Sequence, residues 1–296
     1  MVSQLQGFQV GPYNNTPPPP RPTIDINQLL LALNITNPVA FSNIAEKVVE
    51  LLGAERDYVF HAGRSLSVQA QSKITAIIQD SRFQAWMNSL SSQVLTIIGM
   101  DNNFDMTNVV SPLSYLCAVL TRTSNESQFV HAITFFCRFH MDPDDPLNGA
   151  VGMMQSLITQ IVLSLAETNN LNLGFLTETD LEVIATLDLA MLCQLFDEIL
   201  KTMPAGLVIC MIDGANFFGN ELHLRAMDCA MQFLNSIVEE VNSCQSGVVF
   251  KLLVTSPMGM EYFHLWFPGR VDLTLLGHVP NDHFGFNESM FALPLI

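Results

Sequence analysis

The sequence predicts an α/β protein with a mainly parallel sheet enclosed between layers of helices. Strand-like and helix-like segments alternate through most of residues 90–277, which is the pattern of successive βαβ units. The strand-like segments are apolar throughout, as in GLVICMIDG (206–214), and this is expected where helices cover both faces of a sheet. Right-handed crossovers between such strands make the sheet parallel.

Five strands are expected, centred near residues 94, 132, 207, 249 and 271. The second is expected to run over 131–139, because HAITFFCRF is almost continuously apolar. Helical periodicity predicts the connecting helices, at 111–123, 152–167, 189–203 and 222–243, and residues 168–188 are expected to be a polar connection. The aromatic stretch at 258–267 is expected to pack over a cleft or to contact a partner.

Residues 25–90 are expected to form a helical preamble to the sheet domain, which is assigned to 91–280. Asn37-Pro38 is a plausible helix start, and Trp86 is expected to anchor the preamble to the core. Residues 1–24 contain PYNNTPPPPRP and are expected to be a disordered, proline-rich tail. Residues 281–296 form an apolar tail with no assigned element.

The composition favours a cytoplasmic protein with protein partners. The 296 residues are 49% apolar and only 14% charged, and the net charge of −16 disfavours binding to nucleic acid or anionic membranes. No uninterrupted apolar run reaches the roughly 20 residues of a membrane span, and no signal peptide is recognisable. The six cysteines are therefore expected to be reduced and mostly buried.

Four segments, taken in order, resemble the NACHT-type proteins of the STAND class of signalling NTPases. RFQAWMNSLSSQVLTIIG resembles the lead-in to their phosphate-binding loop (P-loop), GLVICMIDGAN their Walker B strand, and FKLLVTSP the sensor strand that follows. ITFFCRFHMDPDDPLNGAVGMMQSLITQIV is similar to the second strand and next helix of a fungal branch. The resemblance covers roughly residues 40–277. It implies a three-layer P-loop NTPase-like fold with strand order 2-3-1-4-5 and a nucleotide cleft at the carboxyl ends of strands 1 and 3.

The P-loop implied by this resemblance lacks the groups that bind a triphosphate. A working loop reads GxxxxGK[ST], whereas the chain reads GMDNNFDM from Gly99. Phe104 replaces the second glycine, Asp105 the lysine and Met106 the hydroxyl residue, and Thr107 follows one place late. A carboxylate about 4 Å from a phosphate is repelled by roughly 4 kcal/mol at an effective dielectric constant near 20.

The Walker B and sensor segments keep only part of their polar residues. Asp213 and Gly214 match, but Asn216 and Phe217 replace the later acidic residues. Asp213 is the candidate metal ligand of these segments, and it can equally cap a turn or hydrogen-bond the Gly99 loop. After Thr255 and Ser256, proline replaces the arginine that commonly ends the sensor strand.

Three functions compete on this evidence. The first, and favoured, is a catalytically inactive pseudo-NTPase domain that binds a protein partner or itself as a scaffold, without a cofactor. The second is an atypical signalling switch that holds ATP or ADP with magnesium through backbone contacts and Asp213. The third is an unrelated enzyme on the same α/β framework.

Two other groups of residues have both a functional and a structural interpretation. Cys137 and His140, followed by the acidic residues Asp142, Asp144 and Asp145, could bind a metal, although PDDP is good turn chemistry and Arg138 could pair with these acids. Ser256, His264 and Asp213 could form a hydrolase triad, although the sequence has no G-x-S-x-G nucleophile elbow.

Overall fold

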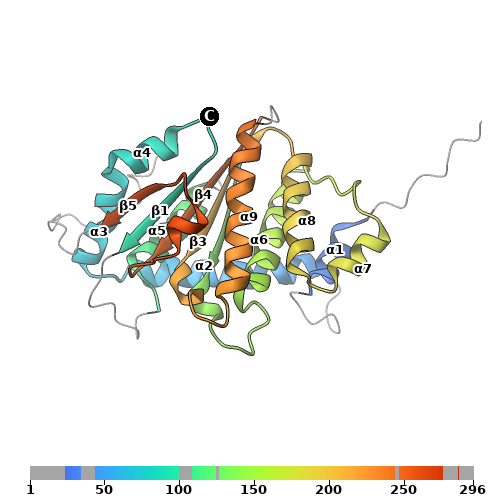
Figure 1. Cartoon of the computed structure of the whole chain (residues 1–296), viewed down its shortest axis with the longest axis horizontal. Helices are drawn as coiled ribbons and strands as arrows, with labels where there is room; N and C mark the ends of the chain where they lie inside the picture. The colour runs from blue at the N-terminus through green and yellow to red at the C-terminus, as the bar shows by residue number, and fades with distance from the viewer. Residues whose placement is uncertain are drawn as a thin grey trace, which may run out of the picture.

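The computed structural model describes residues 24–34, 44–99, 109–124, 127–243, 247–275 and 286. They form an α/β protein in which one parallel five-stranded sheet lies between two layers of helices (Figure 1). The strands are β1 (Gln93–Gly99), β2 (Val130–Phe136), β3 (Gly206–Asp213), β4 (Val248–Ser256) and β5 (Val271–Leu275). The helices are α1 (Ile26–Ala32), α2 (Ile44–Gly63), α3 (Val68–Gln79), α4 (Ser81–Asn88), α5 (Pro112–Ser124), α6 (Gly149–Glu167), α7 (Glu178–Ile184), α8 (Leu189–Thr202), α9 (Leu224–Ser243) and α10 (Phe263–Trp266), with 3₁₀ turns η1 (Cys137–His140) and η2 (Ala215–Phe218).

The order of the strands differs from the expected 2-3-1-4-5. The sheet runs β2-β3-β4-β1-β5, and every neighbouring pair is parallel. β4 therefore separates β1 from β3. Local sequence patterns indicate which segments are strands, but they do not indicate which strands are neighbours. The positions of β1 and β4 in the sheet could therefore not be predicted from these patterns.

This order also moves the crevice at the carboxyl ends of the strands. The connection after β1 leads towards β2, whereas the connection after β4 leads past β1 to β5. Such a reversal between neighbouring strands marks the place where open α/β sheets bind ligands. The strand order therefore places the expected ligand position beside the ends of β1 and β4, not β1 and β3, and Asp213 lies next to it on β3.

Alternating side chains along the strands build two cores. One face of the sheet contributes Val208, Cys210 and Ile212 from β3 to a core completed by α6, α8 and α9, and Figure 1 shows these three helices side by side. The other face contributes Leu207, Ile209 and Met211 to a core with α3, α4 and α5. Strands buried on both sides are apolar at every position, which is the pattern that the sequence displays.

Three elements differ locally from expectation. β2 ends at Phe136, and residues 137–140 turn into η1 instead of extending the strand. α7 lies within the expected polar connection; it is held by a capping box in which the Thr177 and Asp180 side chains bond each other's backbone N–H groups. The proposed helix start at Asn37-Pro38 lies outside the described residues.

α6 is the one helix of the described part of the chain that is long and apolar enough to span a membrane. Of its most apolar window, 78% is buried inside the protein. Its Leu157, Ile158 and Ile161 are fully buried in the core, so α6 has the environment of a central core helix.

Candidate functional site

The most polar group at the centre of the sheet is the carboxylate of Asp213. It ends β3 and is only 2% exposed. The next residue, Gly214, adopts φ +72°, a left-handed conformation that glycine tolerates best, and this turns the chain sharply into η2. The turn keeps the Asp213 side chain inside the protein, between β4 and the start of α5.

Both oxygens of Asp213 accept a hydrogen bond from a hydroxyl group of the chain. Ser114 Oγ donates to Oδ2 at 2.6 Å, and Thr255 Oγ1 donates to Oδ1 at 2.6 Å. Each hydroxyl is itself fixed, because Thr255 Oγ1 accepts the Gly214 N–H at 3.1 Å and Ser114 Oγ lies 2.9 Å from Ser111 Oγ. The carboxylate is thus the centre of a closed network of hydroxyl groups joining α5, β3 and β4.

Burial raises the pKa of Asp213 above its ordinary value, and the hydrogen bonds from Ser114 and Thr255 only partly oppose this shift. The charge of the same carboxylate also affects the pKa values of two buried thiols. Burial, and secondly the charge of Asp213, raise the pKa values of Cys117 and Cys137 well above normal. These cysteines are therefore protonated and chemically inert at neutral pH.

Ser114 is the polar residue that sequence comparison missed. In P-loop NTPases a Ser or Thr after the loop and the Walker B aspartate hold magnesium together, and here Ser114 occupies the position beside Asp213. The alignment from Gly99 instead assigned this role to Met106 or Thr107. The helix begins at Pro112, which is later than the motif set on Gly99 assumes. Ser111, whose side chain accepts the Ser114 N–H, was the available signal of a helix start.

With Ser114 in the hydroxyl position, the residue before it takes the place of the lysine. That residue is Leu113, which is 3% exposed and belongs to the apolar core. Asp105 and Thr107, which the sequence assigned to the loop, lie outside the described residues. The structure therefore brings together Asp213, Thr255 and Ser114, of which the first two lie in segments identified from the sequence.

Gly99 lies at the end of β1, where the sequence predicts room for a phosphate. The main chain of Pro257 occupies this room: a β-carbon at position 99 would lie 3.0 Å from the Pro257 carbonyl oxygen. Ser256, the neighbouring predicted site residue, is fully buried and its hydroxyl donates to the Met258 carbonyl. Because Gly99 has no side chain, the main chain that follows β4 can pack directly against it.

Neither of the other constellations forms the site considered from the sequence. His140 is placed between two carboxylates, with Nδ1 3.1 Å from Asp145 and Nε2 3.3 Å from Glu55. No group of three or more potential metal-binding side chains occurs among the described residues. Arg138 lies over the Phe217 ring at 4.9 Å. Ser256 and His264 share no hydrogen bond with each other or with Asp213, and His264 is exposed on α10.

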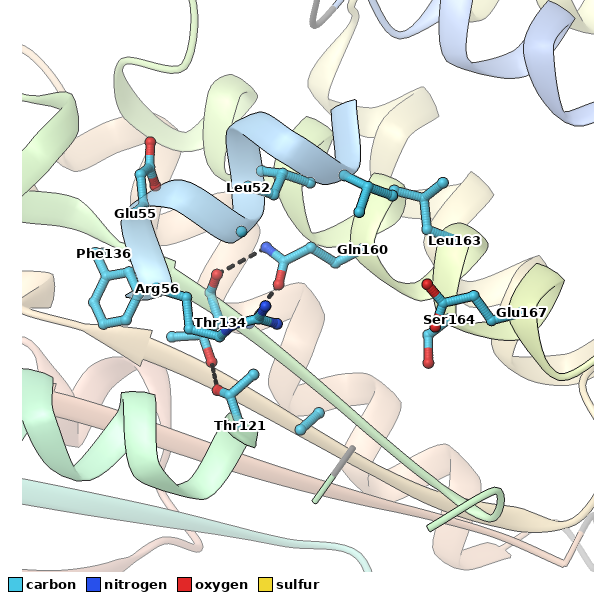
Figure 2. Close-up of a pocket in the computed structure, with 13 residues that line it drawn as sticks. Leu52, Glu55, Arg56, Thr121, Thr134, Phe136, Gln160, Leu163, Ser164 and Glu167 are labelled. Atoms are coloured by element: carbon cyan, nitrogen blue, oxygen red, sulfur yellow. Dashed lines mark hydrogen bonds between the residues drawn. The ribbon is translucent and has the colours of Figure 1, made fainter. Parts of the chain in front are cut away.

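A second concave region lies at the β2 edge of the sheet. α2, α5 and α6 surround a cavity of about 270 Å³, with Glu55 and Arg56 on α2 and Gln160 and Glu167 on α6 (Figure 2). The Gln160 amide bonds both the N–H and the C=O of Thr134, at 2.9 and 2.8 Å. Among the described strands β2 has no neighbour on this side, and the Gln160 amide makes the two bonds that the C=O and N–H of one residue of such a strand would make.

Together, the parallel five-stranded sheet and the helices on both of its faces define a three-layer α/β protein, with an aspartate at the end of β3. No protein-family model matches the chain, and no curated protein matches it. Among solved structures, it is similar to chains in "Structure of Drosophila ORC bound to DNA" (13% identity, TM-score 0.36) and "Structure of Drosophila ORC bound to GC-rich DNA and Cdc6" (9% identity, TM-score 0.33). The matches cover 81% and 94% of this chain but only 35% and 37% of the ORC chains.

Proposed function

We propose that the chain is a catalytically inactive, nucleotide-independent interaction module of the NACHT/STAND kind. The observation that carries the proposal is the closed network around Asp213, in which the chain's own hydroxyl groups occupy both carboxylate oxygens. Magnesium in NTPases bridges an aspartate, a hydroxyl and the phosphates. At Asp213 it would have to disrupt two short hydrogen bonds inside the core.

Loss of positive charge supports the same conclusion. The lysine of a P-loop neutralises the β- and γ-phosphates, whereas Leu113 at that position is apolar and buried. Between Arg82 and Arg122 the sequence contains no lysine or arginine, and it contains Asp101 and Asp105. A bound triphosphate would therefore lack a counter-charge worth about 4 kcal/mol at 4 Å.

A protein partner, or a second copy of the chain, follows from the composition. The chain is 49% apolar, and Leu90, Phe129 and Leu222 are more than half exposed. Large apolar and aromatic side chains on a surface are typical of protein interfaces. In this proposal the module acts in the cytoplasm and does not bind nucleic acid, since its net charge is −16.

An ATP-dependent switch is the second candidate. Ser114 and Asp213 are the residue types that hold magnesium in such switches, and they are neighbours here. The two candidates differ in one measurable property, which is the free energy of nucleotide binding.

Thermal unfolding with and without millimolar ATP or ADP and magnesium distinguishes them. A nucleotide at 100 times its dissociation constant adds about 2.7 kcal/mol to the free energy of unfolding. We expect no change in the melting temperature. A rise that disappears in Asp213→Ala but persists in Glu182→Ala, an exposed control on α7, would establish the switch instead.

A further inference from the structure

The outer edge of β2 has backbone N–H and C=O groups that point away from β3 and are not paired by another described strand. Thr134 directs its N–H and C=O away from β3, because both bond Gln160. The Phe129 carbonyl, five residues earlier, accepts the Leu207 N–H of β3. By the two-residue alternation of a strand, Ala132 faces outward like Thr134.

Between Val130 and Thr134, Ala132 is an open position of the described edge. Upstream, the Val130 N–H bonds the Ser127 carbonyl at 3.4 Å, and downstream Gln160 covers Thr134. Within the described chain no hydrogen bond involves the outward N–H or C=O of Ala132. Ala132 instead lines the 270 Å³ cavity beneath α2.

This cavity lies beside a second one on the same edge of the sheet. The second cavity, of about 350 Å³, is lined by Gln128, Val130 and His131, and both cavities share Ser164 and Glu167 of α6. The β2-edge groove, as we call the two together, therefore runs past the open Ala132 position. Phe129, 63% exposed, stands at the beginning of β2 beside it.

The charges along the groove favour a basic occupant. Glu167 is exposed and lines both cavities. Glu55 also lines the groove but already faces His140 at 3.3 Å, and Arg56 is the cation on the opposite wall. Because Glu167 lies where the two cavities join, and because the chain carries a net charge of −16, attraction is strongest for a positively charged side chain.

We propose that the β2-edge groove binds an extended segment of a partner protein by strand addition, with a lysine or arginine beside Glu167. One residue of the segment pairs through its C=O and N–H with the N–H and C=O of Ala132, so that the segment becomes a neighbouring strand of β2. This inference rests on the proposed function, since it names the surface that an interaction module would use.

The test uses a blocked peptide, acetyl-Thr-Val-Lys-Val-Thr-amide, titrated into the full chain and followed by the backbone amide NMR signals of β2. Two matched probes carry Glu in place of Lys, or N-methyl groups on the backbone nitrogens. We expect the Lys peptide to shift the Ala132 signal, with affinity about tenfold above that of the Glu peptide. We expect N-methylation to remove binding, since it blocks the strand hydrogen bonds.

Variants of the protein complete the test. Ala132→Pro deletes the outward N–H at an edge position, where proline is tolerated, and we expect it to weaken the Lys peptide about tenfold. Glu167→Gln should reduce the preference for Lys over Glu, whereas Glu182→Gln on α7 should leave it unchanged. If Ala132→Pro does not fold, the N-methylated peptide tests the same hydrogen bonds on the unmodified chain.

Three results would overturn the proposal. The first is no binding of the Lys peptide up to about 5 mM, a range that covers weak strand addition, and the second is binding that N-methylation leaves intact. The third is a dimer of the chain itself that Ala132→Pro dissociates, which would make a second copy the occupant. If the peptide does not bind and ATP causes no thermal shift, the proposal for the β2-edge groove is wrong, whereas the proposed nucleotide-independent function still holds.

Discussion

Asp213 shows how a buried carboxylate can connect three elements of a fold. Its carboxylate is buried and satisfied by Ser114 and Thr255, so it joins α5, β3 and β4 from within. A buried polar group costs free energy when a partner is removed, because the remaining groups lose their hydrogen bonds without regaining water. The network therefore makes a stability contribution that can be measured by mutation.

We expect Asp213→Ala to lower the free energy of unfolding by about 2–4 kcal/mol, since it leaves two buried hydroxyl groups unpaired and creates a small cavity. Asp213→Asn keeps the volume and should cost less. Urea unfolding monitored by circular dichroism measures both. Glu182→Ala, which is exposed, should change the free energy by less than about 0.5 kcal/mol. Equal effects of Asp213→Ala and Glu182→Ala would contradict the structural role.

The raised pKa of Asp213 fixes the sign of a pH effect. Between its unfolded value of 3.8 and its higher folded value, the folded state binds more protons than the unfolded state. The stability contributed by this group is therefore complete below pH 3.8 and declines as the pH rises through the folded pKa. Accordingly, the cost of Asp213→Asn relative to the wild type should be largest in acid and should diminish towards neutral pH.

Among the elements, α2 is fastened to the end of β2 by His140. The ring stacks on Phe135 at 4.7 Å, and its nitrogens face Asp145 and, on α2, Glu55. Burial alone lowers the pKa of His140, but the hydrogen bonds and charges of Glu55 and Asp145 outweigh it and raise the pKa above 6.5. The protonated ring therefore attaches α2, which also roofs the β2-edge groove.

We expect His140→Gln to be most destabilising at pH values below 6.5, by about 1–3 kcal/mol. Stability from a raised histidine pKa is present below the unfolded value and is lost as the pH rises through the folded value. The difference from wild type should therefore shrink in alkaline solution. Urea titrations at pH 6 and pH 8.5 measure it, with the exposed His264→Gln as control. A difference that grows with pH would refute the ion-pair account.

Much of the element level was predictable from local pattern. Helical periodicity located α5 and α8 within a residue or two. The expected anchoring by Trp86 is confirmed, since Trp86 is 1% exposed and donates to the Gln93 carbonyl. The order of β1 and β4 was wrong, because neighbouring strands are chosen by contacts distant in sequence. Ser114 was missed for the same reason: it is separated from Asp213 by 99 residues.

At the scale of the whole molecule, the charge balance bears on which macromolecules the chain binds. The chain carries 12 basic and 28 acidic residues. Affinity for DNA depends mainly on neutralising phosphates with lysine and arginine. The excess of acidic residues therefore disfavours binding to DNA.

We expect no binding of a fluorescent 30-base-pair duplex in an anisotropy titration up to about 10 µM protein, even at about 50 mM salt, where electrostatic binding is strongest. Binding that weakens steeply as salt is added would contradict the expectation. Salt-insensitive association would indicate contacts of another kind and would equally overturn it.

The central claim concerns the crevice beside β1 and β4, where the core carboxylate is occupied by hydroxyl groups and no lysine faces a phosphate. Isothermal titration calorimetry of ATP with magnesium into the purified chain tests it most directly. The account predicts no heat beyond dilution at millimolar nucleotide. A single saturable site with a dissociation constant below about 100 µM, worth roughly 5 kcal/mol or more, that Asp213→Ala removes would contradict it.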